Sequence, residues 1–308
     1  MMENSIEVIH VSKYFGQVKA LDGINLSATK GDIFGFIGPD GAGKTTLFRI
    51  LSTLLFPDEG SVIVEGLDVV KEYKKIRRII GYMPGRFSLY QDLSVEENLE
   101  FFATIFGTTI QENYHLVKEI YSQIEPFKKR KAGKLSGGMK QKLALSCALI
   151  HKPAVLFLDE PTTGVDAVSR KEFWEMLYRL KNYGISIIVS TPYMDEASRC
   201  DRIALIQDGR IMALDTPSGI VSQFERKILA LHSKDNYLLQ KFLGGFPAVR
   251  NIYPSGQQVH LTSADTSLKK EDVLSFLQGT EWESAEVMDI TAGIEDCFIE
   301  LMSKNPGD

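Results

Sequence analysis

Short apolar runs, many of them β-branched, alternate with helix-like stretches over residues 6–214. Three of these runs, residues 33–37 (IFGFI), 154–158 (AVLFL) and 185–189 (ISIIV), are almost entirely apolar. Continuous apolar runs bounded by Gly, Asp or Lys are typical of strands buried on both faces, and the helices between them suit crossover connections. The pattern therefore predicts an α/β domain with a mostly parallel sheet.

The strand pattern stops between residues 94 and 150, where apolar residues recur at helical spacing. The sequence therefore predicts a helical subdomain, at about residues 86–150, inserted into the α/β domain. The apolar positions that carry this prediction are Val95, Leu99, Phe102, Ile105 and Phe106.

The pattern changes again after Pro217, where a Pro-Ser-Gly stretch suggests a domain boundary. We expect a first domain over residues 1–221 and an accessory domain over residues 222–308. The order β-α-β-β-α-β with a final helix predicts a small α+β, ferredoxin-like fold for the accessory domain. The expected elements are strand 226–232, helix 236–243, hairpin 249–262, helix 270–277, strand 284–290 and helix 294–302.

The overall charge argues against nucleic acid as a partner. The chain has 308 residues and a formal net charge of −5, whereas phosphate backbones are bound by basic surfaces. Two local basic runs, residues 74–78 and 128–134, are interpreted as solvated surfaces, with a lipid headgroup or partner contact as the alternative.

Cysteine usage indicates a reducing compartment, and the hydropathy pattern predicts no membrane-spanning segment. The three cysteines lie far apart with no metal-ligand spacing, and their odd number leaves no complete disulfide framework. The N-terminus lacks a secretory signal pattern, and no window approaches 18 uninterrupted apolar residues. We therefore expect a cytoplasmic chain that neither crosses a membrane nor is secreted.

Residues 38–45 (GPDGAGKT) match the pattern GxxxxGK[ST], between the expected strand 33–37 and an expected helix 45–54. Glycines let successive N–H groups converge on a polyphosphate, where Lys44 would neutralise phosphate oxygens and Thr45 would hold Mg²⁺. The strand–helix context argues against the alternative, a chance glycine-rich turn. The predicted ATP contacts of this phosphate loop are Gly38, Asp40, Gly41, Ala42, Gly43, Lys44, Thr45 and Thr46.

Two adjacent carboxylates, Asp159 and Glu160, end the apolar run 154–158. Carboxylates are unfavourable on a core strand unless they face a cation or solvent at its C-terminal edge, where ligands of α/β sheets collect. Asp159 fits a Mg²⁺-holding role and Glu160 fits the general base that polarises the attacking water. The alternative is a simple acidic strand end.

Residues 135–141 (LSGGMKQ) precede the Asp-Glu strand. Ser136 is suited to cap the following helix, and Gly137 and Gly138 allow backbone amides to approach an anion, although a plain helix start has the same pattern. This segment resembles the signature of ATP-binding cassette (ABC) ATPases. With the phosphate loop and the acidic pair, the chain resembles that family over residues 4 to about 220. The resemblance implies that two cassettes sandwich two nucleotides, and that this segment binds the γ-phosphate held by the second cassette.

Two more family positions follow from the resemblance. Phe15 falls where the family stacks an aromatic ring on adenine, with Tyr14 as the alternative and a core aromatic as another. Asp166, in residues 163–166 (TGVD), matches the D-loop that crosses the dimer interface.

The chain departs from the family pattern at two positions. Gly85 stands where the Q-loop glutamine is expected, and Pro192 stands where the switch histidine is expected. Neither residue can donate the missing side-chain contact. Gln91 lies six residues beyond the first position and is a weak candidate for a substitute.

The flanking sequences 86–90 and 193–197 resemble the ATPases of drug exporters with ABC-2-type permeases, and most of all the first cassette of two-cassette exporter ATPases. This implies an ATP-hydrolysing exporter subunit, peripheral on the inner face of the cell membrane, that works with integral-membrane permease subunits. The resemblance implies that Gly85 and Pro192 would impair this chain's own site, which favours a heterodimer with a second cassette over a homodimer. A regulatory cassette and a non-transport ABC ATPase are the alternatives.

Overall fold

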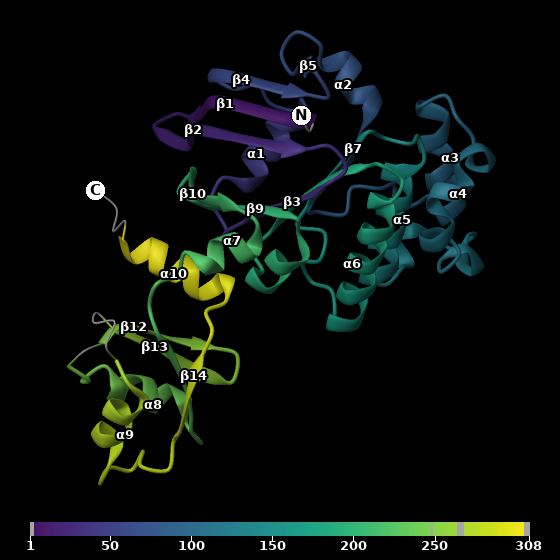
Figure 1. Ribbon diagram of the computed structural model, residues 1–308. Helices are drawn as coiled ribbons and strands as arrows, with labels where there is room; N and C mark the ends of the chain where they lie inside the picture. Colours follow the sequence, from purple (N-terminus) through teal and green to yellow (C-terminus); the bar gives the residue numbers. More distant parts are fainter. Residues whose placement is uncertain (1–2, 248, 264–267, 305–308) are drawn as a thin grey trace. The chain divides into compact units, whose positions relative to one another are not determined.

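The computed structural model describes residues 3–247, 249–263 and 268–304, and it divides into two compact units, Met1–Pro217 and Ser218–Asp308 (Figure 1). The predicted boundary after residue 221 falls inside helix α7 (Pro217–Ser222), whereas the units meet after Pro217. Independent folding of the second unit remains a prediction. Within the described ranges, no helix has the length and apolar character needed to span a membrane.

A six-stranded sheet in the order β10-β9-β3-β8-β7-β6 forms the centre of the first unit. Only β10 runs antiparallel to its neighbour, so the predicted, mostly parallel sheet is confirmed. The three predicted core strands are fully buried along their length, because both sheet faces are covered. The strands are β3 (Ile33–Ile37), β6 (Ile80–Met83), β7 (Val155–Asp159), β8 (Ser186–Thr191), β9 (Arg202–Gln207) and β10 (Arg210–Asp215).

A second sheet of the first unit, in the order β2-β1-β4-β5, is entirely antiparallel and was not predicted as a separate layer. In β1 and β2 buried and exposed positions are interleaved, and such strands carry less apolar sequence than the central ones. Apolar residues from both sheets join one core with helix α1 (Lys44–Leu51). The strands are β1 (Asn4–Phe15), β2 (Val18–Thr29), β4 (Glu59–Val64) and β5 (Leu67–Asp68).

The predicted helical subdomain consists of α3 (Val95–Ile105), α4 (Ile110–Tyr121) and α5 (Gly137–Leu149), which pack on one another (Figure 1). Reciprocal capping boxes begin α3 and α4. Helix α1 ends at Leu51, earlier than predicted, and Thr53 then adopts a left-handed φ of 63°. The other helices of this unit are α1 (Lys44–Leu51), α2 (Tyr73–Ile79) and α6 (Ala167–Lys181), with 3₁₀ turns η1 (Glu125–Phe127), η2 (Ala132–Lys134) and η3 (Met194–Arg199).

The second unit has a four-stranded antiparallel sheet in the order β12-β13-β11-β14. With its β-α-β-β-α-β chain order, this is the predicted ferredoxin-like arrangement. Leucines of the helices and strands form its own apolar core. Its elements are β11 (Ile228–His232), α8 (Asn236–Leu243), β12 (Val249–Ser255), β13 (Gln258–Ser263), α9 (Lys270–Leu277), β14 (Glu286–Ile290) and α10 (Ile294–Lys304).

Candidate active site

The phosphate loop connects β3 to α1 at the C-terminal edge of the central sheet. Gly41 and Gly43 have φ values of +82° and +101°, in the left-handed region that favours glycine. A Cβ atom on Gly43 would lie 2.6 Å from the carbonyl oxygen of Ala20, so a side chain cannot fit there. No side chain caps α1 at Gly43, so the first amides of this helix are available to an anion.

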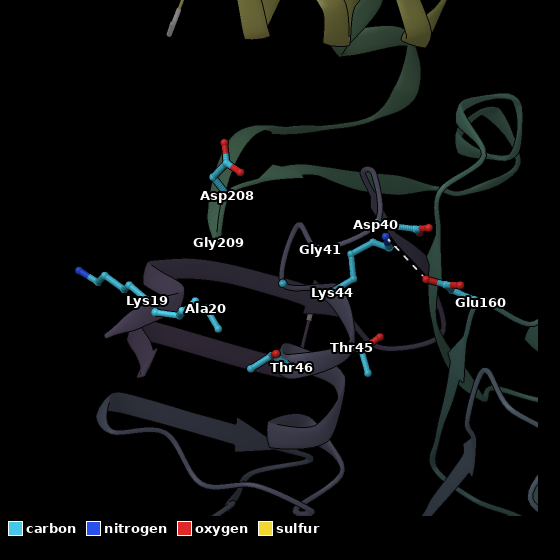
Figure 2. A pocket seen from close by; sticks show the side chains of 12 residues that line it. Lys19, Ala20, Asp40, Gly41, Lys44, Thr45, Thr46, Glu160, Asp208 and Gly209 are labelled. Atoms are coloured by element: carbon cyan, nitrogen blue, oxygen red, sulfur yellow. Dashed lines mark ion pairs between the residues drawn. The ribbon is translucent and has the colours of Figure 1, made fainter. Parts of the chain in front are cut away.

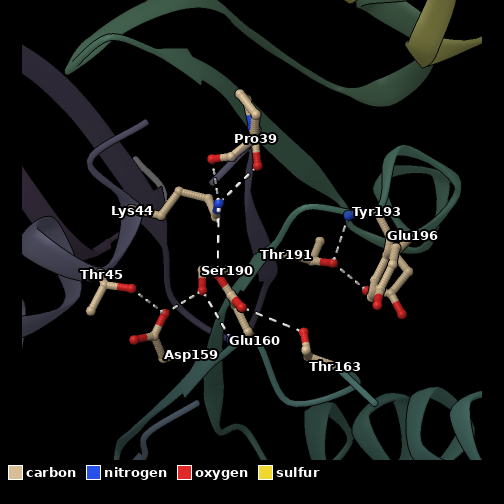
Figure 3. A network of polar contacts seen from close by, with 11 residues as sticks. Pro39, Lys44, Thr45, Asp159, Glu160, Thr163, Ser190, Thr191, Tyr193 and Glu196 are labelled. Carbon is tan, nitrogen blue, oxygen red and sulfur yellow. Dashed lines mark hydrogen bonds and ion pairs between the residues drawn. The ribbon is translucent and has the colours of Figure 1, made fainter. Parts of the chain in front are cut away.

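Lys44 is the first residue of α1, and its side chain is only 3% exposed (Figure 3). Its ammonium group donates to the carbonyl oxygens of Gly38 and Pro39, each at 2.8 Å, and lies 3.8 Å from Glu160 Oε1. Burial lowers the pKa of Lys44, and the nearby carboxylates oppose this shift. The loop thus holds a buried positive charge beside the acidic pair.

A hollow of about 520 Å³ opens over this loop (Figure 2). Its size is within the range of small-molecule binding sites. Gly38 and Ala42 are buried and do not line it. The predicted residues that line the hollow are Asp40, Gly41, Gly43, Lys44, Thr45, Thr46 and Glu160, and those that the sequence did not indicate are Val18, Lys19, Ala20, Asp208 and Gly209.

Asp159 lies at the end of β7 and is 3% exposed. Its Oδ1 accepts hydrogen bonds from the hydroxyl groups of Thr45, at 3.3 Å, and Ser190, at 2.5 Å (Figure 3). The structure therefore brings both predicted metal ligands together. Ser190 was missed as a functional residue, since a serine on an apolar strand carries no distinctive signal.

Glu160 follows Asp159 with a φ of 49°, an uncommon value for a residue with a side chain. Its amide donates to the carbonyl oxygen and to the hydroxyl of Ser190, each at 3.0 Å, and these bonds hold the strained backbone. Its Oε2 accepts from Thr163 at 3.4 Å. The carboxylate is a quarter exposed, at the edge of the hollow, where a water molecule can reach it.

The signature segment forms a second hollow, of about 340 Å³, with the D-loop. Ser136 caps α5 as predicted, accepting from the Met139 amide at 3.4 Å. Asp166 caps α6, accepting from the amides of Val168 and Ser169. These hydrogen bonds lower the pKa of Asp166, that to the Ser169 amide most of all. Ser136, Gly137, Gly138 and Asp166 line this hollow, which shares no lining residue with the phosphate-loop hollow.

Phe15 ends β1 and is 48% exposed, so it is not a core residue. It pairs across the hairpin with Val18, which lines the phosphate-loop hollow. Tyr14 is 37% exposed, and the Lys19 ammonium lies 5.5 Å from its ring centre. Stacking of either ring on adenine stays a prediction.

Gly85 lies beside the acidic pair, where a Cβ atom would come 3.1 Å from the carbonyl oxygen of Asp159. Pro192 follows β8 directly after Thr191. Gly85 therefore lies beside the end of β7, which carries Asp159, and Pro192 lies two residues after Ser190 of β8. Gln91 instead contacts Gly133 of the helical subdomain. The Gly133 amide donates to the main-chain carbonyl oxygen of Gln91 at 2.9 Å.

Comparison with known proteins identifies the family. Residues 21–163 match the model of the ABC transporter family. The Nod factor export ATP-binding protein I of Burkholderia lata is 33% identical over 307 residues, which cover 98% of this chain and 98% of that protein. The chain belongs to the ABC transporter ATP-binding proteins.

The ABC family prediction is confirmed by further relatives. The probable multidrug ABC transporter ATP-binding protein YbhF of Escherichia coli is 38% identical over 279 residues, which are 88% of this chain but 47% of YbhF. This chain thus spans about half the length of YbhF. The daunorubicin resistance ATP-binding protein DrrA2 of Streptomyces coeruleorubidus is 40% identical over 214 residues, 68% of this chain and 66% of that protein.

Solved structures confirm the cassette fold. The cassette MJ0796, in a dimeric post-hydrolysis state bound to ADP and Pi, matches with a TM-score of 0.62 and 27% identity over 68% of this chain and 98% of that one. An ATP-binding subunit of an ABC transporter matches with a TM-score of 0.66 and 27% identity, over 71% of this chain and 92% of that one. ATP binding and hydrolysis are the chemistry of this ABC family, as predicted.

Proposed function

We propose that this chain is the energy-coupling ATPase subunit of an exporter, and that it supplies the impaired site of an asymmetric cassette pair. Relatives named for Nod factor export and daunorubicin resistance support the exporter assignment. The single observation that carries the asymmetry is that the acidic pair is intact, while Gly85 lies beside it and Pro192 stands two residues after Ser190, which contacts both of its members. In this proposal the chain lies at the inner face of the cell membrane, bound to separate permease subunits, with no nucleic acid.

The residues present fit ATP and Mg²⁺. The glycine-lined loop, the uncapped start of α1 and the buried Lys44 ammonium match a triphosphate. Thr45 and Asp159 offer hydroxyl and carboxylate oxygens, the hard ligands that Mg²⁺ prefers. When bound, Mg²⁺ would neutralise charge on the β- and γ-phosphates during transfer.

Glu160 is the proposed general base. Its carboxylate would accept a proton from water as the water oxygen bonds to the γ-phosphorus. The bond between the γ-phosphorus and the oxygen that bridges it to the β-phosphate then breaks, and that oxygen leaves with ADP. Lys44 lies 3.8 Å from this carboxylate and would shift its contacts toward the phosphate oxygens. The two roles explain why the buried ammonium and the Glu160 carboxylate both line the hollow.

The asymmetry follows from which residues serve which site. This chain's phosphate site uses Lys44, Asp159 and Glu160 but has glycine and proline where glutamine and histidine are expected. The opposite site would borrow Ser136, Gly137 and Gly138 from this chain, and these form a separate hollow. A second cassette with its own glutamine and histidine would then have a complete site, which favours a heterodimer.

A regulatory cassette with mainly structural nucleotide is the second candidate, favoured by the same two substitutions. The two candidates differ in turnover: the exporter subunit belongs to a complex that hydrolyses ATP rapidly, whereas a regulatory cassette binds ATP without adding to turnover.

We further propose that the second unit is an accessory domain with no part in nucleotide binding.

Purification of the tagged chain from detergent-solubilised native membranes tests this function. We expect a multi-spanning permease and a second cassette that carries the glutamine and the histidine. Recovery of this chain with the permease but without a different cassette would contradict the heterodimer. Recovery of ribosomal or DNA-bound proteins without a permease would contradict the transport role.

A further inference from the structure

Glu196 is a fully buried carboxylate in the 3₁₀ turn η3, which follows β8. Its Oε2 accepts a hydrogen bond of 2.6 Å from the hydroxyl of Thr191, the last residue of β8 (Figure 3). The Tyr193 amide donates to the same hydroxyl at 3.1 Å. A buried carboxylate is costly unless it has charged or hydrogen-bonding partners, so its other partner matters.

That partner is Arg170 of α6. Its Nε lies 3.7 Å from Glu196 Oε1, and its guanidinium centre lies 4.2 Å from the centre of the Tyr193 ring. Neither Arg170 Nε nor Glu196 Oε1 has a hydrogen-bond partner in the described part of the chain. The two charges thus form an ion pair whose atoms lie slightly beyond hydrogen-bond distance.

The pair joins two functional segments. Arg170 lies one helical turn after Asp166, the D-loop residue that caps α6, and its amide donates to the Asp166 carbonyl at 2.9 Å. On the other side, Thr191 is adjacent to Ser190, whose hydroxyl binds Asp159. A continuous path of contacts therefore runs from the D-loop helix through Glu196 and β8 to the proposed metal carboxylate.

We infer that Arg170 and Glu196 are positioning residues, which set the end of β8 and hence Asp159 according to the position of the D-loop helix. Arg170 is a quarter exposed and only Glu196 is fully buried. An ion pair that buries a carboxylate contributes little net stability compared with apolar packing, so orientation is the better account of its presence. Pro192 lies inside this segment and offers no hydrogen-bond donor. The inference rests on the ATP and Mg²⁺ site of the proposed function, not on the asymmetric pairing.

The test measures the affinity of the full chain for a fluorescent ATP analogue with Mg²⁺ and with EDTA. The Mg²⁺-dependent gain is the ratio of the affinity with Mg²⁺ to the affinity with EDTA. Loss of a residue that orients a metal ligand typically costs about 10- to 100-fold in metal affinity. We therefore expect Arg170→Gln and Glu196→Gln each to lower this gain about tenfold. Affinity in EDTA should stay unchanged. Arg170→Gln also removes the ion pair of Arg170 Nη1 with Asp195 Oδ2, at 3.7 Å. The double variant should therefore lose no more than Arg170→Gln alone, because the contact with Glu196 is already broken there.

Arg179→Gln is the matched control, since Arg179 lies on the same helix in an exposed ion pair with Glu119, at 2.7 Å. Its Mg²⁺-dependent gain should equal that of the unmodified chain. A full gain in both single variants would overturn the inference, as would a loss in Mg²⁺ and EDTA alike that follows the melting temperature. Should the glutamine variants not fold, Arg170→Lys decides: it keeps the charge but not the planar geometry, and an unaltered gain there would overturn the inference.

These outcomes are independent of the pairing proposal. If the exporter complex contains only this cassette, the heterodimer fails while the Mg²⁺-dependent gain is unaffected. If none of the variants nor the unmodified chain gains affinity from Mg²⁺, the proposed metal site itself fails and the inference fails with it.

Discussion

Gly137→Asp in this chain should abolish most ATP hydrolysis by the reconstituted cassette pair. Gly137 begins α5 and lines the signature hollow, where the γ-phosphate of the partner's nucleotide is proposed to bind. A carboxylate there would repel the phosphate and would compete for the free amides of the helix. We expect turnover to fall at least about 50-fold, corresponding to roughly 2.3 kcal/mol of lost transition-state stabilisation.

The substitution should leave this chain's own fold intact. Apart from its chain neighbours and the backbone of its own helix, the described part of the chain places one heavy atom near a Cβ atom at position 137, the carbonyl oxygen of Gly164 at 4.0 Å, so the new side chain has room. An acidic residue in the first turn of a helix is also mildly stabilising. Gly137→Asn is the matched control, because it has the same size without the charge, and it should retain clearly more turnover. Equal turnover in Gly137→Asp and the unmodified pair would contradict the signature assignment.

Lys44→Ala should remove tight Mg-ATP binding by this chain while the fold is kept. Each charge-assisted hydrogen bond to phosphate contributes about 1.5–3 kcal/mol, so losing the ammonium should weaken binding roughly 100-fold. The fold should survive because the ammonium is already desolvated and contacts only loop carbonyls and the edge of Glu160. Titration with a fluorescent nucleotide measures the affinity, and circular dichroism measures the fold.

Lys19→Ala is the control for this prediction. Lys19 lines the same hollow but is exposed and forms an ion pair with Asp22. Removing it should change affinity only slightly, since exposed ion pairs and solvated charges contribute little. Undiminished affinity in Lys44→Ala, or an equal loss in both variants, would contradict the assignment of Lys44 to the phosphates.

Continuous apolar runs predicted the central strands well. The predicted strand 33–37 and the observed β3 coincide, and β7 and β8 shift by only one or two residues at their ends. The antiparallel sheet was missed because β1 and β2 mix buried and exposed positions, and register shifts in their pairing blur a two-residue period. Long-range pairing, and not local pattern, decides that layer.

Sequence motifs predicted the part of the candidate site that is made by residues close together in the sequence. The glycines, Lys44 and the acidic pair were found because phosphate and metal chemistry demands those residue types at that spacing. Ser190 and Glu196 were not, since their roles depend on neighbours distant in the sequence: Ser190 meets Asp159, and Glu196 is buried against Arg170. From the sequence alone, Glu196 in an Asp-Glu-Ala run has the character of an exposed acid.

Steady-state ATP turnover of the reconstituted cassette pair with Glu160→Gln in this chain alone tests the central claim most directly. Glutamine preserves the shape of Glu160 but cannot accept the proton from water. If this chain's own site is the impaired one, the pair should keep most of its turnover, whereas the same substitution at the equivalent glutamate of the second cassette should abolish it. Loss of turnover on Glu160→Gln in this chain, with turnover retained in the reverse combination, would contradict the asymmetric account.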